Sequence, residues 1–240
     1  MGYGYGYSYG LFWDPTYILI IIGMVLSLLA SASVKSTMAK YKKVRCSTGL
    51  TGAMAAEQIL YREGISDVTI ECMEDSDGDH YDPRTKTVRL SRDVYRGATV
   101  TSVAVAAHEC GHAIQHAKSY APMSIRSAMV PVVNFASNLS MPLILLGVVL
   151  SWNQVLINIG IFAFSGALLF QLVTLPVEFN ASSRALAKIG QYGLLAEEES
   201  RGCKKVLRAA AFTYVAAAAA TVLQLVRLVL LFGGGRRRDD

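Results

Sequence analysis

The chain has little charge, few histidines and no paired cysteines, although it is 240 residues long. Charged residues make up 17% of it and hydrophobic residues 52%. A typical soluble domain is ~25% charged, so this composition excludes an ordinary soluble globular fold. The four cysteines form no CxxC pair. Their scatter argues against a zinc ribbon or a redox motif and favours reduced thiols.

Long apolar runs stand where the charge is missing. A helix needs ~20 predominantly apolar residues to cross a bilayer. We therefore predict a mainly α, polytopic membrane protein with about four transmembrane helices and a small α+β cytoplasmic insert. The fourth run is alanine-rich, and a buried core helix is the alternative for it. The four runs are 17–34, 128–150, 154–177 and 210–232, of which the second and third form a hairpin over 128–177.

The segments outside the runs complete the predicted organisation. The lead is rich in glycine and tyrosine, is expected to be flexible, and lacks the basic start of a signal peptide. Asn134, Asn138 and Gln171 lie inside the hairpin, where polar side chains usually face other helices. The remaining segments are the lead 1–16, a peptidase-like region 35–127, a second cytoplasmic segment 178–209 and a tail 233–240.

Lysine and arginine placement predicts the orientation. Five basic residues follow the first run closely, whereas the leading segment has none. The positive-inside rule therefore places 35–127 and 178–209 in the cytoplasm. The three arginines of the tail disagree, because four spans place that tail outside. The net charge of +5 follows from this topology, and we expect no nucleic-acid partner.

Three of the four histidines fall within nine residues, in the segment VAAHECGHAIQHA. On a helix, His108 and His112 lie one turn apart on one face and can bind one metal ion. Glu109 is displaced by about 100° around the axis and can reach a water molecule beside the metal. This HExxH spacing is typical of zinc metallopeptidases. The alternative is a helix whose polar side chains are merely satisfied.

A catalytic zinc site usually has three protein ligands, so one more is needed. His116 lies ~12 Å along the helix from His108, too far for both to reach one ion, and is expected to border the site. No Asp or Glu occurs from 113 to 177, and the next one is Glu178. We predict Glu178 as the third ligand, with capping of a helix N-terminus as the alternative.

These motifs give the chain a resemblance to bacterial integral-membrane neutral zinc metallopeptidases of the YugP type. The resemblance covers nearly the whole chain, including FWDPTYIL, HYDPRTKTVRLS, the hairpin and QLVTLPVEFNASSRALA. It implies a zincin-like insert in which His108, His112 and Glu178 bind one Zn²⁺ and Glu109 acts as the base. It also implies a multi-pass protein of the bacterial inner membrane with the site on the cytoplasmic side.

The chain is more distantly similar to the HtpX-type membrane peptidases, which carry a Glu-x-x-Ala-Asp motif on a later helix. Ser182 stands where those relatives have aspartate. The resemblance therefore leaves Asn180 or Ser182 to orient a ligand.

The predicted function is a membrane-embedded zinc endopeptidase. Its oxyanion donor is not identified, and the candidates are His80, Tyr192 and Arg184. The segment 86–91 is either an exposed edge strand that binds extended substrate or an ordinary sheet strand. Expected partners are the lipid bilayer and protein or peptide substrates, membrane proteins among them, with a homo-oligomer or a membrane partner left open. The alternative is a scaffold with a structural zinc site, whose fourth ligand would be His116.

Overall fold

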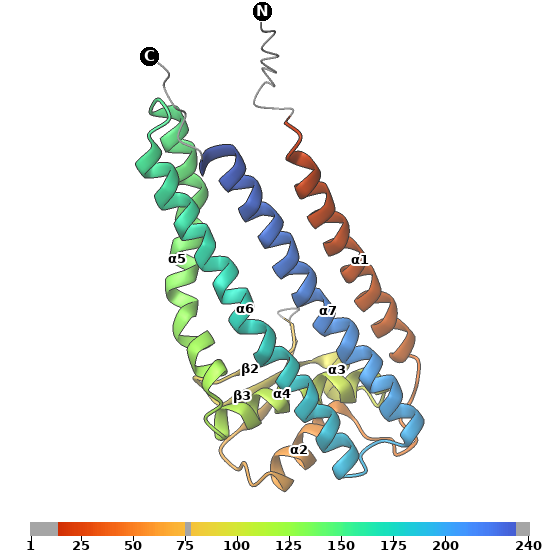
Figure 1. Ribbon diagram of the computed structural model, residues 1–240. Helices are drawn as coiled ribbons and strands as arrows, with labels where there is room; N and C mark the ends of the chain where they lie inside the picture. The colour runs from red at the N-terminus through yellow and green to blue at the C-terminus, as the bar shows by residue number, and fades with distance from the viewer. Residues whose placement is uncertain (1–13, 75–77, 234–240) are drawn as a thin grey trace, which may run out of the picture.

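Four long helices dominate the computed structural model, which describes residues 14–74 and 78–233. Each is long and apolar enough to cross a membrane (Figure 1). The mainly α polytopic fold is therefore confirmed, and α7 is as sparsely buried as the others, unlike a core helix. Most of the predicted lead and tail lie outside the described residues. The helices are α1 (Tyr17–Tyr41), α5 (Ala121–Val149), α6 (Gln154–Gln191) and α7 (Glu197–Leu228), which continues into a π-helical turn (Val229–Gly233).

The long helices lie side by side in the order α5, α6, α7, α1 (Figure 1). α5 and α6 form a hairpin whose helices approach closely at two glycines. A Cβ at Gly147 would lie 3.0 Å from the carbonyl oxygen of Asn153, and one at Gly160 would lie 2.7 Å from that of Ser140. Within the described residues, α5 has no comparable packing against α7 or α1, so the array is not closed into a ring.

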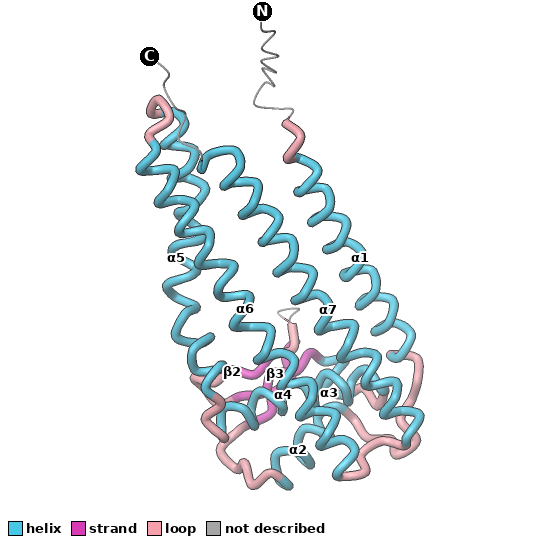
Figure 2. The backbone as a smooth tube through the Cα atoms, in the orientation of Figure 1, coloured by secondary structure: helices cyan, strands magenta, loops and turns pink. Residues whose placement is uncertain are grey.

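A small α+β unit lies at one end of the long helices (Figure 2). Its three strands form one sheet in the order β1–β3–β2, with β3 parallel to β1 and antiparallel to β2. The elements are α2 (Gly52–Arg62), β1 (Thr69–Met73), β2 (His80–Asp82), β3 (Thr87–Ser91), α3 (Arg92–Arg96) and α4 (Val100–Ala117).

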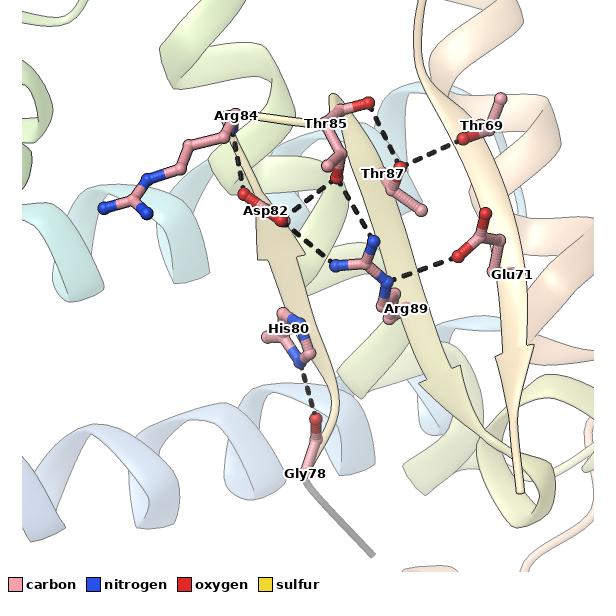
Figure 3. A network of polar contacts seen from close by, with 9 residues as sticks. All are labelled: Thr69, Glu71, Gly78, His80, Asp82, Arg84, Thr85, Thr87 and Arg89. Atoms are coloured by element: carbon pink, nitrogen blue, oxygen red, sulfur yellow. Dashed lines mark hydrogen bonds and ion pairs between the residues drawn. The ribbon is translucent and has the colours of Figure 1, made fainter. Parts of the chain in front are cut away.

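The strand at 86–91 is not an exposed edge, because β3 is the central strand of the sheet. Its inner face is fully buried at Val88. Its outer face carries Arg89, whose guanidinium pairs with Glu71 of β1 and Asp82 of β2 (Figure 3). The Arg89 side chain thus joins all three strands. β2 is an outer strand of the sheet, so one of its edges has no strand partner among the described residues.

α4 is the centre of the α+β unit and packs against α2, α6, α7 and the sheet. Thr99 begins the helix, since its Oγ1 accepts a hydrogen bond from the N–H of Ser102 at 3.2 Å. Small and apolar residues over 100–107 then pack into the core. At Gly111, α4 crosses α6 so closely that a Cβ would lie 2.5 Å from the carbonyl oxygen of Ala181. This crossing sets the HExxH segment against α6.

Candidate metal centre

Three potential metal ligands from two helices converge where α4 crosses α6. They are His108 and His112 of α4 and Glu178 of α6, whose donor atoms lie within 4.8 Å of one another. Nε2 of His108 lies 3.3 Å from Oε2 of Glu178, and Nε2 of His112 lies 3.7 Å from the same oxygen. Tetrahedral ligands about 2.0–2.1 Å from a zinc ion lie ~3.3 Å apart. The spacing and the chemistry of these donors therefore fit zinc.

His112 is held in orientation by a buried glutamine that the sequence interpretation missed. Nδ1 of His112 lies 3.0 Å from Oε1 of Gln115, which makes the ring the donor and leaves Nε2 free for a metal. The amide nitrogen of Gln115 donates to the carbonyl oxygen of Val177 and to Oδ1 of Asn180. Because both ends of the amide are bonded, its orientation is fixed. Partners of this kind accompany almost all metal-binding histidines.

The hydrogen-bond partner of His108 fixes its tautomer less firmly than Gln115 fixes that of His112. Oγ of Ser182, on α6, lies 3.1 Å from Nδ1 of the ring. A hydroxyl can donate or accept, so it does not by itself select the tautomer that exposes Nε2. An aspartate at this position would hold Nδ1 protonated. The serine therefore leaves His108 the less firmly oriented of the two histidines.

Glu178 is only 2% exposed and lies inside α6, not at its start. The helix-capping alternative is therefore wrong. Its second oxygen, Oε1, lies 3.4 Å from Nη1 of Arg126 on α5. Both carboxylate oxygens thus have partners, as a buried charge requires.

Glu109 borders the same space without joining the ligand set. It is buried, with 7% of its surface exposed. Burial raises the pKa of Glu109, although the neighbouring imidazoles of His108 and His112 oppose that shift. A carboxylate with a raised pKa beside the metal ligands is suited to accept a proton from water and to return it.

A cavity of about 350 Å³ opens in front of the ligands, and we call it the metal cleft. Tyr214 of α7 lines it and also a second cavity of about 200 Å³ on the side of α7 and Met38. The walls of the metal cleft are β2 with the turn that follows it and the first turns of α5: His80, Tyr81, Pro83 and Arg84 on one side, and Met123, Arg126, Ser127 and Val130 on the other.

The other predicted site residues differ in their distance from the cleft. His80 lines it, with Nδ1 2.9 Å from the carbonyl oxygen of Gly78. Asn180 reaches the site through Gln115 and also accepts a hydrogen bond from Nε of Arg184 at 2.7 Å. Arg184 points instead to the ring of Tyr120 and does not line the cleft.

His116 and Tyr192 do not line the metal cleft. Nδ1 of His116 lies 2.8 Å from the hydroxyl of Tyr81 and borders a separate cavity. The hydroxyl of Tyr192 donates to Glu63. Within the described residues His116 therefore does not belong to the group of converging donors, and it reaches the cleft only through Tyr81.

Sequence interpretation also missed Arg126 and Tyr214. Arg126 and Lys118 are the only charged residues from 113 to 177. A lone arginine at the start of an apolar run, with Glu178 at the end of the next antiparallel run, is a signal for their pairing. Tyr214 stands among alanines with no such signal.

A HExxH helix crossed by a membrane helix that carries a glutamate is the arrangement expected of a membrane zinc metallopeptidase. Residues 16–233 match the family model described as "Putative neutral zinc metallopeptidase", and the chain belongs to this family. It is 49% identical over 199 residues to the "Putative membrane protease YugP" of Bacillus subtilis (strain 168), which covers 83% of this chain and 88% of that protein. No solved structure matches. The relative and the four apolar helices identify a multi-pass membrane protein.

Proposed function

We propose that the protein is a zinc-dependent endopeptidase that cuts peptide bonds at the membrane surface. In this proposal His108, His112 and Glu178 bind one zinc ion and Glu109 is the general base. The observation that carries it is the convergence of three donor atoms from α4 and α6 within 4.8 Å. Family membership supports zinc as the metal.

In the proposed mechanism, separate side chains transfer the proton and orient the zinc ligands. When bound, zinc supplies Lewis acidity to the scissile carbonyl and to the attacking water. The carboxylate of Glu109 takes a proton from that water and delivers it to the leaving amine. Gln115 and Ser182 keep the two imidazoles turned toward the ion, and Arg126 holds the free oxygen of Glu178.

Three protein ligands leave one position for water and substrate, which distinguishes a catalytic zinc site from a structural one. The scaffold alternative needs a fourth ligand, and His116 is its candidate. In the described chain His116 is instead bonded to the hydroxyl of Tyr81. This placement supports the enzyme over the scaffold.

The free edge of β2 is the substrate-binding strand of the proposal. β2 borders the metal cleft and, among the described strands, pairs with β3 on one side only. An extended peptide can add to such an edge through main-chain hydrogen bonds. Its scissile bond would then lie beside Glu109.

The proposed location is the bacterial inner membrane, with the cleft on the cytoplasmic side. The end of α1 nearest the α+β unit carries Lys35 and Lys40, and Lys42 and Lys43 follow directly. Basic residues of this kind favour the cytoplasmic face.

The test measures zinc content and casein cleavage on the same detergent-purified samples. We expect about one zinc per wild-type chain, no zinc in Glu178→Ala, and unchanged zinc in His116→Ala. Glu109→Gln is expected to keep zinc and to lose cleavage by roughly 10²–10⁴-fold. Equal cleavage by wild type and Glu109→Gln would reject the enzyme. Zinc retained by Glu178→Ala would reject the third ligand.

A further inference from the structure

A strip of polar groups on α5 continues from the metal cleft along the membrane-spanning part of the helix. Val130 and Ser127 line the cleft. Asn134 and Asn138 follow Val130 by about one and two turns, rotated from it by about 40° and 80° toward the side of Ser127. We call Ser127, Asn134 and Asn138 the polar strip.

Both asparagines of the strip are exposed, contrary to the prediction that they join helices of this chain. Inside a bilayer there is no water to satisfy an amide, so polar groups of a span face another helix or a functional surface. A third amide of the hairpin, Asn158, has a partner on its own helix, because Nε2 of Gln154 donates to its Oδ1 at 2.9 Å. The strip is therefore a surface that needs a hydrogen-bonding partner.

Two prolines add backbone acceptors to the strip. Pro131 and Pro142 lie inside α5. Proline has no N–H, so each deprives the carbonyl four residues earlier of its helical hydrogen bond. Those carbonyls belong to Ser127 and Asn138. The strip thus offers carbonyls that accept and amides that both donate and accept.

A polar group of α6 is also unsatisfied. Gln171 lies two turns from Glu178 and about 20° around the helix from it. Its Oε1 is buried without a hydrogen-bond partner. Among the described helices, none closes the array between α5 and α7, so the bundle has an open side.

Peptide-bond cleavage explains which partner needs such groups. A helix that crosses the bilayer has its backbone hydrogen-bonded internally, and an extended segment must be freed from it to enter the cleft. Each freed N–H or C=O is costly in lipid unless a protein group replaces its partner. A second copy of this chain would pair the asparagines with its own amides but would bring no freed backbone to the cleft, and self-cross-linking at Asn138 is the outcome that identifies it.

We propose that the polar strip of α5 binds the end of a transmembrane helix of a substrate protein and holds its backbone unwound beside the metal cleft. The proposal rests on the proposed peptidase function and specifies its substrate class. The substrates are membrane proteins cut where a span leaves the bilayer on the side of α4.

The experiment compares two reporters in lipid nanodiscs: a casein segment fused to a single ~20-residue leucine–alanine helix, and the same segment without the helix. The variant is Asn134→Leu with Asn138→Leu, and the matched control is Asn158→Leu. We expect the ratio of anchored to soluble cleavage to fall about tenfold in the double variant, because each interhelical amide bond contributes roughly threefold. The control keeps the wild-type ratio, and Asn134→Gln with Asn138→Gln restores part of it.

An unchanged ratio in the double variant would overturn the proposal, as would a variant that loses both activities equally. Failure of the wild type to cut either reporter at full zinc loading would instead reject the peptidase function. Cross-linking then tests the strip alone, in Glu109→Gln protein. A cysteine at Asn138 should cross-link to one at the end of the reporter helix, and a cysteine at the exposed Val132 should not. Asn138→Cys protein that cross-links only to its own kind would also reject the proposal.

Discussion

Two buried carboxylates hold α6 against the α+β unit, and only one of them faces a reactive cleft. Glu178 meets the Nε2 atoms of two histidines. Glu63, just after α2, meets Nζ of Lys118 at 3.0 Å and Nζ of Lys188 at 2.5 Å, and accepts a hydrogen bond from Tyr192. The side chains of both glutamates are almost fully buried, at 3% and 5% exposure.

The chemical identity of the donors explains the difference. Ammonium groups have no lone pair, so the Glu63 cluster is a closed set of ion pairs that joins the ends of α2, α4 and α6. Neutral imidazoles have a lone pair and can exchange a carboxylate contact for a metal ion. Burial alone would not tell which of the two glutamates is suited to bind a metal ion.

The largest expected effect is a difference in zinc content between the Glu178 and Glu63 variants. Glu178→Gln should lose its zinc and its casein cleavage to background, since a ligand is gone. Glu63→Gln should keep about one zinc per chain in the same elemental analysis. Zinc loss in both variants would mean that the Glu63 cluster also shapes the metal centre.

The next effect is on stability and belongs to Glu63. Glu63→Gln should lower the free energy of unfolding by about 1–3 kcal/mol, because the mostly buried Lys188 loses its counter-charge while the half-exposed Lys118 is solvated. Chemical denaturation in detergent measures it. The control is Glu71→Gln, which removes a partly exposed pair with Arg89 and should cost less than ~1 kcal/mol. Equal losses of unfolding free energy in the two variants would show that the Glu63 cluster stabilises the fold no more than the partly exposed Glu71–Arg89 pair does.

The stability that Glu63 contributes should depend on pH. Burial opposes ionisation of Glu63, but its bonds to Lys188, Tyr192 and Lys118 prevail and lower its pKa to about 2 from an ordinary 4.5. A depressed pKa gives stability that is present above pH ~4.5 and lost as pH falls toward 2. Wild type should therefore lose more stability than Glu63→Gln across that window. Parallel curves for the two proteins would contradict this.

A smaller effect is expected from the residue that orients His112. Gln115→Leu should weaken zinc binding roughly 10–100-fold, because the ring loses the acceptor for Nδ1. Competition with a chromogenic chelator measures the affinity. Asn158→Leu, whose amide lies on α6 within the hairpin, should leave it unchanged.

The smallest effect is expected at Ser182. Its hydroxyl directs the tautomer of His108 weakly, so Ser182→Ala should weaken zinc binding by only a few-fold, less than Gln115→Leu. The same competition assay ranks the two. The reverse ranking would show that the serine holds its histidine as firmly as the glutamine does.

The four spans and the proximity of His108, His112 and Glu178 could be predicted because both follow from local patterns. Apolar length identifies a span, helical spacing places His108 beside His112, and the shortage of acids leaves Glu178 as the next candidate. Strand order is a different matter. β3 is the central strand because β1 pairs with it in parallel and skips β2, which lies between them in the sequence but at the other edge of the sheet. No local sequence pattern reveals this order.

The partners of the site were missed for the same reason. Gln115 looks like any helical glutamine until α6 crosses at Gly111 and sets Val177 against its amide. Tyr214 reaches the cleft only because α7 packs beside α6. Such contacts depend on tertiary crossings between segments far apart in the chain.

The crossing of α4 and α6 also sets the order in which the proposed zinc ligands are made. His108 and His112 leave the ribosome before Glu178, and the whole of α5 and most of α6 lie between them. Chains are made from the N-terminus, so the histidines are made before the hairpin, and Glu178, the proposed third ligand, is made near the hairpin's end. A nascent chain still threading through the insertion machinery therefore has only part of its zinc site. In the proposed function, the zinc site is therefore completed only after the hairpin that lies between its ligands has been made.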